Sequence, residues 1–137
     1  MNTAEALALV ESSRVARLAT VRPDGRPHLV PITFAITAGT IVTMIDLKPK
    51  TTSELQRLRN IDANPSVSVM VDEWNEDWDH LRWVRVDGTA RVHSDDDVWR
   101  HARDALIVKY PQYSAQPPEG AAISITIDGV TSWTSSG

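Results

Sequence analysis

Cysteine is absent from the sequence, and so is any excess of basic residues. Without cysteine, disulfide bonds, iron–sulfur clusters and thiolate zinc sites are excluded. The 14 lysines and arginines are outnumbered by 18 aspartates and glutamates, which gives a formal net charge of −4. Because no basic run offsets this acidity, nucleic acid is not an expected partner.

Long apolar segments are also missing from the chain. No apolar run approaches the roughly 18 residues that a membrane-spanning helix needs. The first residues, MNTAEALALVESSR, lack the charged, apolar and small-residue order of a signal peptide. We therefore expect a cytoplasmic protein without a membrane partner.

The motifs of common catalytic and metal sites are absent as well. The sequence has no G-x-S-x-G, no Gly-rich P-loop and no G-x-G-x-x-G. The histidines lack the H-x-x-x-H spacing of a helical zinc pair, and the Asp95–Asp97 run is typical of a helix start. We expect no metal site and assign no catalytic side chain.

What is present suits one mainly β domain spanning residues 1–137, with 42% hydrophobic and 23% charged residues. Short stretches with alternating faces, joined largely by turns, favour an antiparallel β-barrel with flanking helices. Pro31 cannot donate to a strand ladder, so it should lie at an edge, a bulge or a break in the sheet. Six strands are expected, at residues 14–21, 28–35, 40–45, 66–72, 81–92 and 122–128, with helices at 3–13, at 51–63 and from 95 onward.

The chain is organised around residues 40–63, which read as a strand, a short basic loop and a helix. Thr51 and Glu54 have the spacing of a capping box, and Leu55, Leu58 and Ile61 give the helix one apolar stripe. The loop Lys48-Pro49-Lys50 thus meets the positive end of a helix, where unpaired N–H groups favour a phosphate. The alternative is a capped surface helix preceded by solvated lysines.

A phosphate site without a set of catalytic side chains suits an enzyme whose cofactor supplies the chemistry. The spacing does not say which cofactor this is. It also leaves open a binding protein that carries or stores a flat ligand without turnover.

The segments RVARLATVRPDGRPHLVPITFA, DLKPKTTSELQRLRNIDANPSVSVMVD and WVRVDGTARV occur in that order. They resemble the pyridoxamine-phosphate-oxidase-like family of FMN-binding split β-barrels, over roughly residues 10–128. The loop Lys48-Pro49-Lys50-Thr51 is similar to the K-x-K-T loop of the actinobacterial, F420-dependent branch. FMN oxidases of the family carry a further Arg-x-x-x-x-Lys motif on an earlier strand. Residues 28–35 of this chain contain no arginine or lysine.

This resemblance implies a six-stranded split barrel that forms a homodimer, with two cofactor sites along the subunit interface. Lys48, Lys50, Thr51 and Thr52 would hold the cofactor phosphate. Residues Val30, Pro31, Ile32 and Thr33 would supply the strand beside the ring system, and the partner would contribute from around Trp83 and Arg85. A barrel that is split at Pro31 also has edge strands with unpaired backbone groups, and a second subunit would cover these edges.

The implied activity is hydride transfer between the deazaflavin coenzyme F420 and an unidentified, flat and conjugated small molecule. Two alternatives remain: an FMN-dependent oxidoreductase on the same fold, and a non-catalytic protein that carries a flavin or deazaflavin. The missing basic residues on strand 28–35 weigh against FMN.

Overall fold

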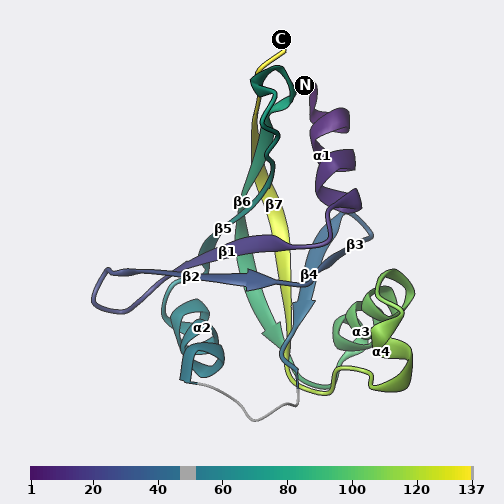
Figure 1. The fold of residues 1–137 in the computed structure, drawn as a ribbon. Helices are drawn as coiled ribbons and strands as arrows, with labels where there is room; N and C mark the ends of the chain where they lie inside the picture. The colour runs from purple at the N-terminus through teal and green to yellow at the C-terminus, as the bar shows by residue number, and fades with distance from the viewer. Residues whose placement is uncertain (47–51, 137) are drawn as a thin grey trace.

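The computed structural model describes residues 1–46 and 52–136. Within these residues one sheet contains seven strands: β1 (Ala16–Val21), β2 (Pro27–Ile32), β3 (Ala35–Thr37), β4 (Thr40–Met44), β5 (Ser66–Glu73), β6 (Arg82–His93) and β7 (Ala122–Thr134). They are ordered β2-β1-β5-β6-β7-β4-β3, and neighbouring strands are antiparallel. The sheet curls so that β1 and β2 cross the long β6–β7 pair (Figure 1). The expected mainly β split barrel is confirmed.

The expected count of six strands is wrong, because the stretch at residues 28–35 does not form one strand. β2 ends at Ile32 on one edge of the sheet, and β3 begins at Ala35 on the opposite edge. Pro31 lies on the edge strand, as predicted. Between them Phe34 is fully buried, and its backbone N–H donates to the Tyr110 hydroxyl at 3.2 Å. The Phe34 N–H thus finds its hydrogen-bond acceptor outside the sheet, at the point where the chain passes from the β2 edge to the β3 edge.

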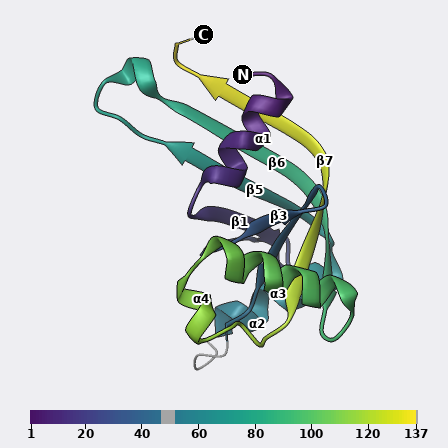
Figure 2. The ribbon, with the colours of Figure 1, turned by 90° about the vertical axis from the view of Figure 1, so that its right-hand side faces the viewer.

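The helices of the described residues flank this sheet: α1 (Thr3–Ser12), α2 (Thr52–Ala63), α3 (Asp97–Lys109), the short α4 (Gln112–Ala115) and the 3-10 helix η1 (Trp78–His80). α1 packs on β6 and β7, α2 packs on β1 and β6, and α3 covers β3, β4 and β7 (Figures 1 and 2). None of these helices, within residues 1–46 and 52–136, combines the length and apolarity needed to cross a membrane.

The core lies on one side of each strand because side chains alternate along it. In β6, Val84 and Val86 are fully buried, while Arg85 between them is exposed. The main core is filled by such alternating apolar residues under α1 and α2. A smaller cluster lies under α3 and includes Leu106 and Tyr110.

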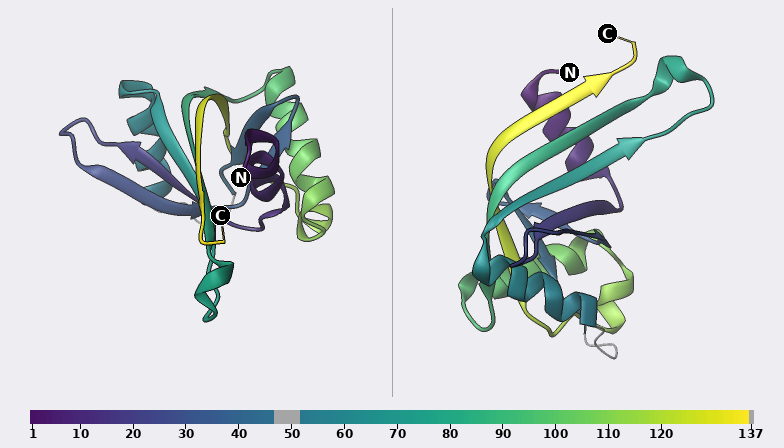
Figure 3. Two further views of the ribbon diagram at one scale, coloured as in Figure 1. Left: turned by 90° about the horizontal axis from the view of Figure 1, so that it is seen from above. Right: turned by 90° about the vertical axis from the view of Figure 1, so that its left-hand side faces the viewer.

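The longest part of the sheet is the β5–β6–β7 ribbon, which extends away from α2, α3 and α4 and carries η1 between β5 and β6 at its end (Figure 3). A register shift between Asp87 and Gly88 interrupts the β6–β7 ladder. The strand pair therefore contains a bulge or irregularity at Gly88. Bulges increase the local twist of a strand pair, which fits the strong curl of this sheet.

Candidate functional site

The strand–loop–helix region predicted to bind phosphate is described only in part. β4 ends at Met44 and α2 begins at Thr52, so the strand and the helix form where the sequence predicts them. Lys48, Lys50 and Thr51 lie outside the described residues. Their contact with a phosphate therefore stays a prediction.

A buried polar pair fixes α2 against the sheet. Asn60 of α2 is fully buried, and its Nδ2 donates to the hydroxyl of Thr20 in β1 at 2.9 Å. Its Oδ1 accepts a hydrogen bond from Gln56 Nε2 at 2.7 Å. A buried amide left unpaired would cost about 1–3 kcal/mol, so this contact sets the position of the helix. Asn60 is not among the residues predicted for the site; the one local signal for it is its place next to the apolar, buried Ile61.

His28 lies in the same layer, opposite Thr20 in the β1–β2 register. Its side chain is buried on the core face of β2. Burial, followed by the positive charges of Arg22 and Arg57, lowers the pKa of His28. The imidazole is thus neutral near pH 7 and adds no positive charge beside α2.

The opposite, solvent-facing side of the sheet carries an apolar surface, which we call the outer face. Leu29, Met70 and Trp133 on it are 67%, 38% and 45% exposed. Leu29 stands opposite Ala19, and Trp133 stands opposite Trp83. A pocket of about 310 Å³ lies on this face, lined by Arg17, Ala19, Leu29, Ser68, Met70, Asp72 and Arg85. A large apolar patch of this kind marks an interaction surface.

Two arginines border the outer-face pocket. Met70 stands opposite Arg17 in the β1–β5 register and opposite Arg85 in the β5–β6 register. Arg17 Nη1 lies 3.3 Å from Asp72 Oδ1, and both side chains remain partly open to solvent. Arg85 Nε lies 3.4 Å from Asp87 Oδ1, and its guanidinium is 5.9 Å from the centre of the Trp83 ring. The pocket thus offers an apolar floor with cations at its rim.

The structure separates the predicted ring-binding residues by side-chain direction. Pro31 is exposed on the side of β2 that also carries Leu29, whereas Ile32 is only 5% exposed and lies in the core. Val30 is half-buried and packs against the same core. The Thr33 hydroxyl is 2.8 Å from the Tyr113 hydroxyl. Only Pro31 of this set faces the side of the sheet that also carries the predicted Trp83 and Arg85.

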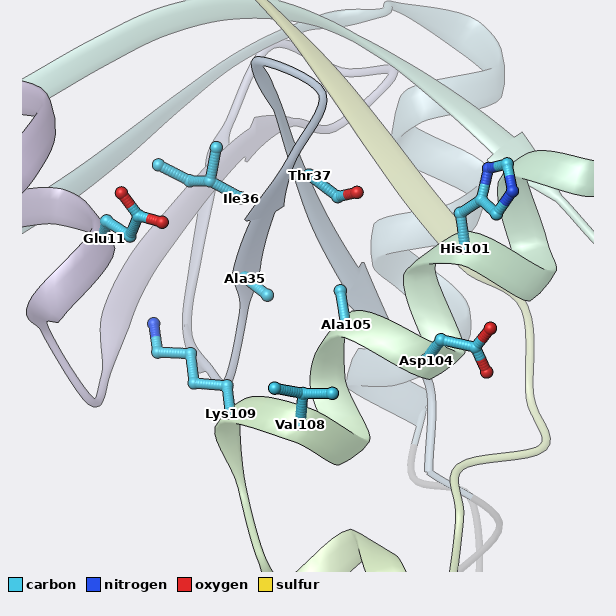
Figure 4. Close-up of a pocket in the computed structure, with 9 residues that line it drawn as sticks. All are labelled: Glu11, Ala35, Ile36, Thr37, His101, Asp104, Ala105, Val108 and Lys109. Atoms are coloured by element: carbon cyan, nitrogen blue, oxygen red, sulfur yellow. The ribbon is translucent and has the colours of Figure 1, made fainter.

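A second pocket, of about 430 Å³, lies between the edge strand β3, α3 and the end of α1 (Figure 4). It contains none of the residues predicted for the cofactor. Glu11, Asp104, His101 and Lys109 are its ionisable residues. Lys109 Nζ lies 3.8 Å from the centre of the Phe34 ring and has no hydrogen-bond partner among the described residues. Burial, together with the nearby Arg14, lowers the pKa of Lys109 to about 8.

At pH 7, Lys109→Met is expected to raise the free energy of unfolding by about 1 kcal/mol. Methionine fills a similar space and keeps a favourable contact with the Phe34 ring, but it buries no charge. This gain in the free energy of unfolding is smaller than the free energy that corresponds to the full pKa shift, because the site is partly open to water. Between pH 8 and 10.5 the unfolded chain binds more protons than the native protein, so the wild type gains stability as pH rises. Urea unfolding at pH 7 and pH 10.5 measures this, and equal gains at both values would contradict it.

No group of three histidine, aspartate or glutamate side chains lies close enough to hold a metal ion within the described ranges 1–46 and 52–136. The candidate features of a site are the predicted phosphate loop before α2, the edge strand β2 and the outer-face pocket. They comprise a predicted phosphate contact, an apolar surface and rim cations, which are the features of a site for a flat, anionic ligand.

The chain is similar to several known proteins over most of its length. The chain is 29% identical over 129 residues to the F420H(2)-dependent biliverdin reductase of Mycobacterium tuberculosis (strain CDC 1551 / Oshkosh), covering 92% of this chain and 84% of that protein. The crystal structure of the conserved hypothetical protein Rv2991 from Mycobacterium tuberculosis has a TM-score of 0.80 at 25% identity, covering 98% of this chain and 86% of that one. A FAD-binding protein from Mesorhizobium loti has a TM-score of 0.74 at 25% identity, covering 96% and 94%.

The family comparison covers almost the whole chain. The model of the pyridoxamine 5'-phosphate oxidase family matches residues 3–134, which include every strand of the described sheet and all ten predicted site residues. The chain belongs to the pyridoxamine 5'-phosphate oxidase family, with the flavin-binding split-barrel fold.

Proposed function

We propose that this protein is an F420-dependent oxidoreductase that transfers hydride between the deazaflavin and a flat, conjugated small molecule. The observation that carries the proposal is the 29% identity, over 92% of the chain, to an F420H(2)-dependent biliverdin reductase. The absence of arginine and lysine from residues 27–36, which include β2 and the start of β3, supports it, since an FMN oxidase would carry basic residues there.

The residues of the site suit the chemistry of F420, which has a flat ring system and an acidic phosphate and glutamyl side chain. Lys48, Lys50, Thr51 and Thr52 would bind the phosphate at the start of α2, whose axis the Asn60–Thr20 contact holds. Residues Val30, Pro31, Ile32 and Thr33 would position the ring, with Ile32 and Val30 acting through the backbone because their side chains pack in the core. When bound, the deazaflavin supplies a two-electron hydride transfer, and the protein's part is to orient the reactants and exclude water.

The proposed site is shared between two subunits that meet through the outer face. Leu29 and Met70 are exposed at its centre, and a second copy would cover them. Trp83 and Arg85 lie on the same face, while their neighbour Val84 is buried in the subunit's own core. The partner subunit's Trp83 and Arg85 would then reach the cofactor held by the first subunit. An arginine on an aromatic ring at an interface is a favourable anchor for an acidic group.

A conjugated tetrapyrrole is the first acceptor to test, because the F420-dependent relative is named for biliverdin. Its extended π system and its carboxylates suit a site at the proposed subunit interface, where apolar residues adjoin Arg17 and Arg85. The FAD-binding neighbour at 25% identity keeps a flavin-dependent enzyme as the second candidate.

Titration of the apoprotein with F420 and with FMN tests the cofactor directly. We expect tighter binding of F420, and Lys50→Ala should weaken it at least about tenfold, because a charge-assisted hydrogen bond is worth roughly 1.5–3 kcal/mol. Lys109→Met is the control for the loss of a lysine outside the predicted phosphate loop, and it should weaken F420 binding far less than Lys50→Ala does. Tighter binding of FMN would overturn the F420 assignment. Binding without turnover of any conjugated acceptor would identify a carrier.

A further inference from the structure

A hydrogen-bonded chain of serine, histidine and aspartate lies between the end of β6, β7 and the start of α3, apart from the proposed cofactor site. His93 Nε2 is 2.7 Å from the Ser124 hydroxyl, and His93 Nδ1 is 2.8 Å from Asp96 Oδ2. The His93 side chain is only 9% exposed, and Ser124 is half-buried. Both ring nitrogens are therefore engaged, one by a possible nucleophile and the other by a carboxylate.

The three residues come from three elements of the fold: His93 from the end of β6, Ser124 from β7 and Asp96 from the start of α3. Ser124 stands opposite Arg91 in the β6–β7 register, and His93 lies two residues beyond Arg91, so His93 shares its face. Asp96 is the N-cap of α3: its Oδ1 accepts from the backbone N–H of Trp99 at 2.9 Å, which leaves Oδ2 for His93. The helix is tied down in turn by Trp99 Nε1, which donates to the Gly120 carbonyl at 2.8 Å.

The electrostatics favour one tautomer of His93. The hydrogen bonds from the Trp99 backbone and from His93 lower the pKa of Asp96, so its carboxylate stays ionised. An ionised carboxylate at Nδ1 requires a proton on that nitrogen. Nε2 is then the acceptor, and the Ser124 hydroxyl donates to it. This is the arrangement in which a histidine acts as general base on a serine.

A pocket of about 240 Å³ opens onto this serine. Among its lining residues are Thr40, Arg91, Val98, His101, Ser124 and Thr126. Arg91 stands opposite Ser124 in the ladder and lines the same pocket, so the pocket that holds the serine also contains a cation, the kind of group that stabilises an oxyanion. The pocket's volume restricts it to small ligands.

We propose that Ser124 is the nucleophile of a second site that hydrolyses small carboxylic esters, with His93 as general base and Asp96 as the residue that positions it. Ser124 Oγ bonds to the ester carbonyl carbon while its proton passes to His93 Nε2. The carbon–oxygen bond to the alcohol then breaks, and the alcohol leaves with that proton. Water, deprotonated by the same nitrogen, next attacks the acyl-serine, releasing the acid and restoring the Ser124 hydroxyl.

A fluorophosphonate probe tests the nucleophile, because it bonds covalently to activated serines. Intact mass and peptide mapping should show one adduct per chain, on Ser124, and none in Ser124→Ala. His93→Gln should slow labelling and p-nitrophenyl acetate hydrolysis at least about 100-fold. Asp96→Asn keeps a helix-capping oxygen but removes the charge, so it should slow labelling without changing the melting temperature.

Ser132→Ala is the matched control, since Ser132 is another half-buried serine of β7, with its hydroxyl on the Met1 carbonyl instead of a histidine. It should label like the wild type, and F420 titration of Ser124→Ala should match the wild type and report an intact fold. Absence of an adduct, or an adduct on another serine, would mean that the chain of hydrogen bonds only joins α3 to the sheet. That outcome would leave the cofactor proposal untouched.

Discussion

Leu29→Asp is expected to convert the proposed dimer into a folded monomer that no longer binds F420 tightly. Leu29 is 67% exposed in the single chain, so the substitution should barely change the stability of the monomer. In the proposed dimer the same carboxylate would be buried on an apolar surface without a partner, which costs several kcal/mol. We therefore expect the dimer dissociation constant to rise at least about 100-fold, as measured by sedimentation at several concentrations.

The matched control is Val108→Asp, which places the same charge on an even more exposed apolar residue of α3, at 85% exposure and away from the outer face. It should remain a dimer with wild-type affinity for F420. If the wild type sediments as a monomer and binds one F420 per chain, the shared site is wrong. A dimeric Leu29→Asp would place the interface elsewhere.

Gly88→Ala is expected to cause a large loss of stability, because the sheet leaves no room for a methyl group at this position. A Cβ at Gly88 would lie 2.4 Å from the Thr126 carbonyl oxygen and 2.6 Å from Ile125 Cγ2. The nearest atom belongs to the backbone of the neighbouring strand, so the β6–β7 ladder itself must move. Overpacking of this kind costs about 3 kcal/mol, which would lower the melting temperature by roughly 10 °C.

Gly129→Ala provides the comparison, because Gly129 lies on the same ladder, opposite Asp87, and a Cβ there meets no atom within 4 Å. Its melting temperature should change by no more than a few degrees. Calorimetry of both variants measures the difference. Similar melting temperatures for the two would show that the bulge at Gly88 can relax around a methyl group.

The residues of the outer face are only partly predictable from the sequence. Alternation along β6 predicts that Trp83 and Arg85 share one face, and the structure agrees because a strand has a fixed period of two. It does not predict that Leu29 and Met70 join them, since these residues come from β2 and β5, which only the sheet order brings to either side of β1. The Asn60–Thr20 contact spans 40 residues, and no local pattern encodes it.

The sequence by itself determined the fold class, most of the strands and the family, because turn residues, alternation and motif order are local properties of the chain. Only the tertiary structure decided the rest. It divided the stretch around Pro31 between two sheet edges, with Phe34 buried between them and its N–H bonded to the Tyr110 hydroxyl. It also brought Ser124 to His93 across 31 residues, because antiparallel pairing of β6 and β7 sets which distant side chains share a face.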